Sequence, residues 1–264
     1  LPKTLEPTRQ MAKVPDCEYG EKAQVDFGEK WMRNAKGRQI KVHFMIMVLM
    51  RSRYKFVYMQ NVPFTSRTTV YAHHLAFRYF GGVPKKVVYD QDRRMLVNEN
   101  YGDYVMTDEF AKYVKSVSFE PVFCMPYDPS SKGQSEAVVK YVKNNFLAGR
   151  TYVSIDSLND EVLGWLERTG NGKVNSSTRL IPAEEFKTER LKLMPYVETM
   201  QEPKLEAREY SIRKDNTLLY HSNFYSLPLG TYEGPGSKVL VVKNVDNNEL
   251  DIYDPKDFSL ITRH

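Results

Sequence analysis

Three consecutive segments near the start of the chain have the side-chain patterns of β-strands and are joined by short turns. Residues 22–28 alternate apolar and polar side chains, residues 39–50 are nearly all apolar, and residues 54–60 form a third strand pattern. Alternation is typical of a half-buried strand, whereas a continuous apolar run is typical of a strand buried on both faces. Because the turns at 34–37 and 51–53 are too short for a crossover, the sequence predicts an antiparallel meander.

Helical and strand patterns alternate after the meander. The expected elements are a helix at 65–80 that ends at Gly81-Gly82, a strand at 85–90, a helix at 108–117, a strand at 119–124, a loop at 125–133, and helices at 134–147 and 157–168. Strands followed by such alternation predict an α/β fold, in which a mixed five-stranded sheet is flanked by helices.

The C-terminal part of the chain returns to short strand patterns. The apolar runs lie at 217–221, 224–227, 238–243, 249–253 and 259–261, and Asn, Gly and Pro residues separate them. This spacing predicts a small all-β domain of barrel type. The expected organisation is an N-terminal linker at 1–20, a core at 21–186, a linker at 187–207 and the C-terminal domain at 208–264.

Charge is unevenly distributed along the chain. The net charge is +5, but residues 154–210 contain eleven acidic and eight basic side chains, which leaves +8 for the rest. An anionic partner therefore fits the strand-rich parts. The longest apolar run, at 44–50, is much shorter than a bilayer span, and the two cysteines, Cys17 and Cys124, have no metal-binding spacing. We therefore expect a cytoplasmic protein without a membrane span.

Three acidic residues lie at positions in strands and a helix where packing and secondary structure do not call for a carboxylate. Asp26 lies within the first strand, although Asp is depleted in strands, and Asp90 ends the strand at 85–90. Glu136 is expected in the first turn of the helix at 134–147. If the strand that ends at Asp90 is a parallel neighbour of the first strand, the three carboxylates converge. Converging carboxylates raise one another's pKa unless a divalent cation such as Mg²⁺ compensates them, so the sequence predicts a metal site.

Each acid also has an ordinary interpretation. An Asp at a strand end is often a turn or cap residue, and Glu136 with Lys140 has the spacing of an ion pair on a solvated helix. Asp92 is a rival to Asp90, but it lies beyond the apolar run. The order of the three acids, their elements and the adjoining loop together favour a site.

Basic side chains accompany these acids. Lys140 and Lys143 share a helix face with Glu136, and the group Arg51, Arg53 and Lys55 contains no acid. Basic rows beside metal carboxylates are suited to hold a phosphate backbone. The residues expected to contact nucleic acid are Lys132, Lys140, Lys143, Arg93 and Arg94, with Tyr127 stacking on a base.

Several motifs occur in a fixed order. They are residues 23–28 (AQVDFG), 88–90 (VYD), 132–136 (KGQSE) followed by Lys140, 181–186 (IPAEEF), 225–228 (YSLP) and 261–264 (ITRH). This set, which covers about residues 15–264, resembles the DDE transposases of the retroviral-integrase type, in particular the IstA-type transposases of bacterial insertion sequences.

The resemblance implies an RNase H-like fold and a reaction with two Mg²⁺ ions, for which Mn²⁺ can substitute. In that reaction the DNA 3′ ends of the element are cut and then joined to target DNA. The matching motifs assign Asp26, Asp90 and Glu136 as catalytic and metal-binding residues, and Lys140 as the basic residue one helical turn later. The implied partners are transposon-end and target DNA, further copies of the chain in a synaptic multimer, and an AAA+ ATPase helper of IstB type.

The sequence departs from the family pattern in two respects, and it leaves two alternative functions open. The interval between Asp90 and Glu136 is longer than in retroviral integrases, and no helix-turn-helix or zinc module precedes the first strand, so specific end recognition is expected to be reduced. A non-catalytic module with this fold would bind DNA and assemble without turnover. A simple RNase H-like nuclease would cut RNA:DNA hybrids.

Overall fold

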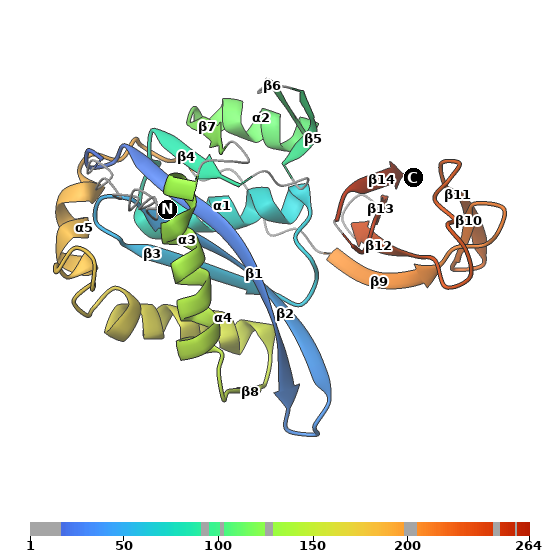
Figure 1. The fold of residues 1–264 in the computed structure, drawn as a ribbon, viewed down its shortest axis with the longest axis horizontal. Coiled ribbons are helices and arrows are strands. Elements are labelled where there is room, and N and C mark those ends of the chain that lie inside the picture. Colours follow the sequence, from blue (N-terminus) through green and yellow to red (C-terminus); the bar gives the residue numbers. More distant parts are fainter. Residues whose placement is uncertain are drawn as a thin grey trace, which may run out of the picture.

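A mixed sheet with helices on both faces forms the core of the protein (Figure 1). The computed structural model describes residues 17–90, 95–100, 103–124, 129–197, 205–244, 249–256 and 258–264. The strands are β1 (Lys22–Asn34), β2 (Gln39–Leu49), β3 (Lys55–Gln60), β4 (Lys86–Tyr89) and β7 (Glu120–Phe123), in the spatial order β3-β2-β1-β4-β7. The short β8 (Thr151–Tyr152) pairs with the end of β1 as a sixth strand. The predicted meander and mixed sheet are confirmed, but the sheet has six strands rather than the predicted five, because the short β8 adds to the end of β1.

Two apolar cores cover the two faces of the sheet. The helices are α1 (Ser66–Phe80), α2 (Asp108–Val117), α3 (Pro129–Tyr141), α4 (Ile155–Trp165) and α5 (Pro182–Arg190), with π-helical turns η1 (Val142–Phe146) and η2 (Leu166–Gly170). Ala23 and Val25 of β1 pack in one core with α1 and α2, whereas Ile46 and Val48 of β2 pack in the other with α3 and α4. No helix in the described part of the chain is long and apolar enough to cross a bilayer.

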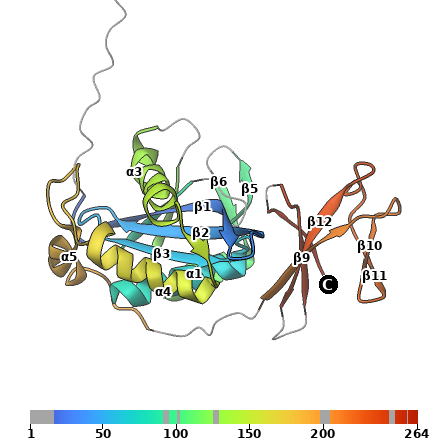
Figure 2. The same ribbon diagram turned by 90° about the horizontal axis from the view of Figure 1, so that it is seen from below.

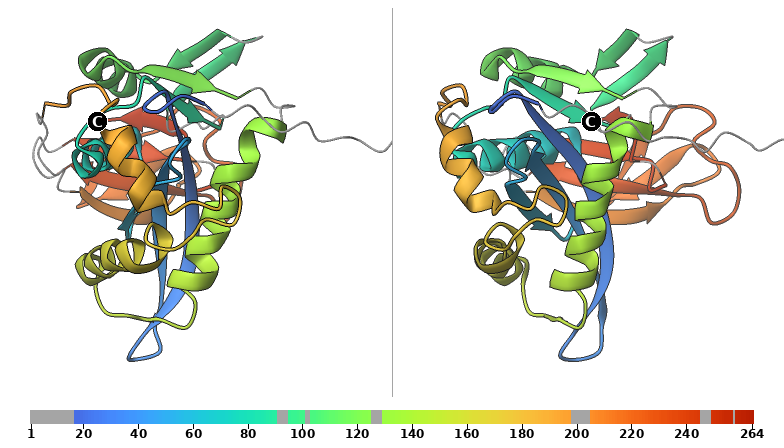
Figure 3. Two further views of the ribbon diagram at one scale, coloured as in Figure 1. Left: turned by 90° about the vertical axis from the view of Figure 1, so that its left-hand side faces the viewer. Right: turned by 60° about the vertical axis from the view of Figure 1, so that its left-hand side comes forward.

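The register of β1 and β2 decides which side chains face α3. Asp26 lies opposite Ile46, and Gln24 lies opposite Val48. Side chains directly opposite each other in an antiparallel pair share a face of the sheet. Asp26 therefore points to the face that α3 covers, and Figure 3 shows α3 running beside β1 on that face.

α3 begins earlier than the sequence predicts. The loop prediction for residues 129–133 is wrong, because α3 starts at Pro129. Glu136 consequently lies about two turns into the helix rather than in its first turn. Proline is favoured at the first position of a helix, and a glycine such as Gly133 is tolerated inside one at a cost of about 1 kcal/mol.

The C-terminal part of the chain is all β. Its strands are β9 (Leu205–Ser211), β10 (Thr217–Tyr220), β11 (Asn223–Ser226), β12 (Lys238–Asn244), β13 (Leu250–Tyr253) and β14 (Leu260–Arg263). A sheet of order β14-β13-β12-β9 and the separate hairpin β10-β11 share one apolar core (Figure 2). No strand pairing among the described residues closes them into a barrel, so the barrel form and the domain boundaries stay predictions.

Ion pairs connect this β-region to the core. Arg67 of α1 contacts Glu109 of α2 at 3.1 Å and Glu249, next to β13, at 3.4 Å. Arg263 of β14 approaches the same Glu109 at 3.8 Å. A second hairpin, β5 (Leu96–Asn100) with β6 (Asp103–Met106), lies in the long interval between Asp90 and Glu136.

Gly28 of β1 leaves room for the fully buried ring of Phe44. A Cβ at residue 28 would lie 2.3 Å from Cζ of Phe44, which is directly opposite on β2. We expect Gly28→Ala to lower the free energy of unfolding by about 1–3 kcal/mol, measured by urea denaturation, because the ring must move within a packed core. Gly164→Ala in α4, where the nearest atom is the end of the Arg168 side chain, should instead stabilise the protein. Equal effects at the two positions would contradict this account.

Candidate active site

The register of β1 and β4 places two of the predicted carboxylates side by side. The two strands are parallel, and Gln24 lies beside Val88. Two residues beyond this last pair, Asp26 and Asp90 are at equivalent positions of the two parallel strands and therefore on the same face of the sheet. Asp26 is partly buried within β1, whereas Asp90 directly follows β4 and is exposed.

α3 brings the third carboxylate to this pair. The buried Ser135 of α3 forms a side-chain hydrogen bond with the Asp26 carboxylate. Glu136, the next residue, is close enough for its charge to act on Asp26. The Asp26 carboxylate also accepts a hydrogen bond from the backbone N–H of Phe27 at 2.7 Å. The structure therefore brings Asp26, Asp90 and Glu136 into one electrostatic group.

The pKa of Asp26 is raised above its ordinary value of 3.8, chiefly by burial. The hydrogen bonds from Phe27 and Ser135 oppose this rise, and the charges of Asp90 and Glu136 add to it. None of the described groups that shift this pKa is cationic, so the described part of the chain supplies the ionised carboxylate with no countercharge. A set of carboxylate oxygens in this condition fits a hard divalent cation such as Mg²⁺, which would supply that charge.

The three carboxylates are not already closed around one point. Among the described residues, no three Asp, Glu, His or Cys side chains form a ready cation site. Glu136 instead pairs with Lys140 at 3.0 Å, as the ordinary interpretation of its spacing predicts. Both side chains are more than half exposed, and exposed pairs contribute at most about 1 kcal/mol, so turning Glu136 toward a cation costs little.

The residues expected to contact nucleic acid are only partly within the described chain. Lys140 is exposed on α3, and Lys143 is half-buried in η1, where its carbonyl oxygen accepts a hydrogen bond from Lys30 Nζ at 2.9 Å. The side chain of Lys132 lies outside the described part of the structure, as do Arg93, Arg94, Tyr127 and the rival acid Asp92.

Ser135 is a site residue that the sequence analysis did not single out. The sequence nevertheless contains a signal for it, because Val138, Val139 and Val142 mark the buried side of α3. Helical spacing places residue 135 on that same side. A buried hydroxyl requires a partner, and the carboxylate of Asp26 supplies one.

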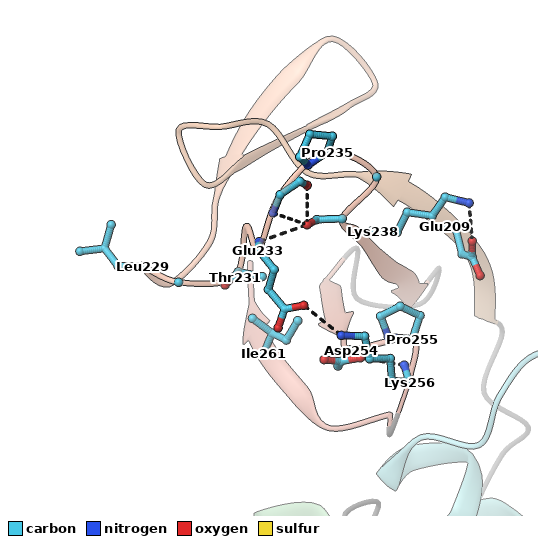
Figure 4. A pocket seen from close by; sticks show the side chains of 14 residues that line it. Glu209, Leu229, Thr231, Glu233, Pro235, Lys238, Asp254, Pro255, Lys256 and Ile261 are labelled. Carbon is cyan, nitrogen blue, oxygen red and sulfur yellow. Dashed lines mark hydrogen bonds and ion pairs between the residues drawn. The ribbon is translucent and has the colours of Figure 1, made fainter.

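A cavity of about 730 Å³ lies among the loops of the β-region, and paired charges line it (Figure 4). Glu209 pairs with Lys238 at 3.2 Å on its lining, and Glu233 pairs with Lys256 at 3.0 Å. Because these charges are already compensated, the cavity has no evident preference for an anion.

Curated proteins similar to the chain are transposases. It is 47% identical over 256 residues to a transposase for an IS21-like insertion sequence element of Bacteroides fragilis, which is 97% of this chain and 49% of that protein. It is 31% identical to a putative transposase for insertion sequence element IS5376 of Geobacillus stearothermophilus, over 67% of this chain and 44% of that protein. No family model matches the chain.

Solved structures give a weaker likeness. The catalytic core domain of HTLV-2 integrase, solved in complex with magnesium, aligns with a TM-score of 0.46 and 15% identity over 65% of this chain and 99% of that one. A chain of a simian T-cell lymphotropic virus intasome aligns with a TM-score of 0.48 and 14% identity over 97% of this chain and 85% of that one. Scores below 0.5 assign no function.

The sequence relatives therefore identify the family. The chain spans about half the length of the curated relatives that it matches. A third, the transposase for insertion sequence element IS21 of Pseudomonas aeruginosa, is 28% identical over 78% of this chain and 52% of its own length. The chain belongs to the family of IS21-like insertion-sequence transposases.

Proposed function

We propose that the chain is the catalytic core of a transposase that cuts DNA at the 3′ ends of an insertion sequence and joins them to target DNA. The observation that carries this proposal is the group of Asp26, Asp90 and Glu136, which the parallel register of β1 with β4 and the position of α3 bring together. Three antiparallel strands followed by two parallel ones support an RNase H-like fold.

Asp26, Asp90 and Glu136 would hold Mg²⁺ in this site, with Mn²⁺ as a substitute. Two such ions supply activation of an attacking oxygen and stabilisation of a leaving oxygen in phosphodiester chemistry. The protein's own groups prepare the ligands: the hydrogen bonds from Ser135 and the Phe27 N–H favour the ionised form of the Asp26 carboxylate, against the burial that raises its pKa. Lys140 forms an ion pair with the Glu136 carboxylate as long as no metal ion is bound there.

The reaction has two steps of the same kind. In the first, the oxygen of a water molecule attacks phosphorus at the end of the element, and the P–O bond to the terminal 3′ oxygen breaks. In the second, the freed 3′-hydroxyl attacks a target phosphodiester, and the 3′ oxygen of the target leaves. Each step forms one P–O bond and breaks one, so the chemistry consumes no further reactant.

The proposed partners follow from this reaction. They are transposon-end DNA, target DNA, further copies of the chain in a synaptic multimer, and an AAA+ ATPase helper of IstB type. We propose that the protein acts on the nucleoid in the bacterial cytoplasm.

The proposal is tested with a labelled insertion-sequence-end duplex, a plasmid target, and an RNA:DNA hybrid of the same sequence, each with Mg²⁺, Mn²⁺ or EDTA. We expect metal-dependent cutting of the duplex and joining to the plasmid, abolished by EDTA. Preferential cutting of the hybrid would instead indicate an RNase H-like nuclease. Binding of the duplex without metal-dependent turnover would indicate a non-catalytic assembly module.

Ser135→Ala should raise the Mg²⁺ concentration that gives half-maximal cutting by about 10–100-fold, because it removes a hydrogen bond that orients a metal-binding carboxylate. The measurement is the cutting rate over a Mg²⁺ titration. Ser157→Ala on α4, where the hydroxyl bonds to Glu161, removes a similar group away from the site. Equal Mg²⁺ requirements for the two variants would refute the role of Ser135.

A further inference from the structure

A second cavity, of about 490 Å³, lies on the same side of the sheet as Asp26, along the flank of α3 that carries Ala137 and Tyr141. Its lining includes the basic residues Arg53, Lys55 and Lys173, together with hydroxyl and amide groups from residues 169–177. No acidic residue is among the described residues that line it. We call it the Lys55 pocket.

Lys55 has an unusual position for a charged side chain, since only 5% of it is exposed. Its ammonium group donates hydrogen bonds to the carbonyl oxygens of Arg53 at 2.8 Å and Gly170 at 2.9 Å. The structure records no ion pair between Lys55 and any described carboxylate. Burial, and secondly the charge of Arg53, lowers the pKa of Lys55 from 10.5 to about 8. A buried ammonium without an anion is unfavourable, and an anion in the pocket would compensate it.

The surrounding backbone holds Lys55 in place. The buried side chain of Asn171 accepts a hydrogen bond from the Lys55 N–H at 2.9 Å and donates one to its carbonyl oxygen at 2.9 Å. Arg53 stands in the left-handed region at φ 63°, a conformation that costs a residue with a Cβ about 1–2 kcal/mol. The Lys55 pocket is therefore preformed in the absence of a ligand.

The strand registers give the distance from the pocket to the candidate active site. Gln24, Val48 and Lys55 form a row across β1, β2 and β3, and Asp26 is two residues from Gln24. Strand spacings of about 4.8 Å across and about 3.4 Å per residue along place the Cα atoms of Asp26 and Lys55 about 12 Å apart. A DNA strand advances about 3.4 Å per nucleotide along the helix axis, and its successive phosphates lie farther apart than this rise, so the separation corresponds to about two nucleotides.

We propose that the Lys55 pocket binds a backbone phosphate of the DNA strand that is cut at Asp26, about two nucleotides from the scissile bond. This proposal rests on the proposed function for the identity of the DNA. Lys55 and Lys173 supply the positive charge, and the hydroxyl and amide groups of residues 169–177 donate to the remaining phosphate oxygens. The pocket positions the strand and takes no part in the chemistry.

The test measures binding of a fluorescent insertion-sequence-end duplex in EDTA, between about 50 and 200 mM KCl, so that cutting cannot contribute. Lys173→Gln and Lys55→Met should each weaken binding about tenfold and reduce the slope of log K against log salt by about 0.9, the value for one lost phosphate contact. The double variant should lose no more slope than either single variant, because both residues hold one phosphate. Lys115→Gln, which removes another exposed charge, on α2, serves as the control and should change neither value.

Unchanged affinity and slope in Lys173→Gln, which is exposed and should fold normally, would overturn the proposal even if Lys55→Met failed to fold. Far-UV circular dichroism reports folding of each variant. Inorganic phosphate is titrated separately: if its binding depends on Lys173 while duplex binding does not, the pocket takes a free anion and the DNA assignment is wrong. If duplex binding depends on Lys55 and Lys173 but the wild type shows no metal-dependent cutting, the proposed function is refuted while the assignment of the Lys55 pocket as a phosphate site is supported.

Discussion

Asp26→Asn is expected to lower metal-dependent cutting and joining of insertion-sequence DNA by about a thousandfold or more. The substitution keeps the size of the side chain but removes the charge of the proposed metal ligand that interacts with Asp90 and Ser135. Loss of about 4 kcal/mol of transition-state stabilisation corresponds to a factor of about a thousand. Single-turnover rates with saturating Mg²⁺ measure the effect.

The folded state should tolerate this change. Because burial and two like charges oppose ionisation of Asp26, its neutral replacement should leave the free energy of unfolding equal or higher. Asp160→Asn, at an exposed position on α4, is the matched control and should keep full activity. A well-folded Asp26→Asn protein with a rate within tenfold of the wild type would exclude Asp26 as a metal ligand.

Glu189→Ala is expected to lower the free energy of unfolding by about 3–5 kcal/mol. Glu189 of α5 is fully buried, and its carboxylate accepts hydrogen bonds from the N–H groups of Gly20 at 3.1 Å and Ser52 at 2.8 Å. It thereby ties α5 to the residues before β1 and to the turn before β3. Alanine would leave both donors buried without an acceptor.

Chemical denaturation followed by circular dichroism measures this loss. Glu184→Ala, on the same helix, removes an exposed carboxylate that forms a surface ion pair with Lys187, and it should cost less than about 1 kcal/mol. A similar small change in both variants would show that the Glu189 carboxylate does not anchor the start of the sheet.

The order of the core elements could be predicted from the sequence because the underlying signals are local. Alternation at residues 22–28, the apolar run at 39–50 and the helix stop at Gly81-Gly82 each depend on neighbouring residues. The approach of Asp90 to Asp26 follows from one further step, the parallel pairing of β4 with β1. The start of α3 was not predictable from composition, because prolines and serines occur in loops as well as in first helical turns.

The remaining features depend on contacts between distant parts of the chain. The polar surroundings of Glu189 predict a linker, yet its hydrogen-bond partner Ser52 is 137 residues away in the sequence. The sequence shows Lys55 as one member of a basic group, but the burial of its side chain depends on Asn171 and Gly170, which lie beyond β8 and α4. Polar residues of this kind resemble solvated ones until the fold supplies their partners.

The most direct test of the central claim is anomalous X-ray diffraction from crystals of the protein grown with Mn²⁺. If Asp26, Asp90 and Glu136 form the metal site, an anomalous peak should lie about 2.1 Å from carboxylate oxygens of Asp26 and Asp90, within the range expected for an Mg²⁺-type ion. Glu136 should have turned from Lys140 toward the site. Ordered Mn²⁺ elsewhere, with none at these carboxylates at saturating metal, would contradict the assignment.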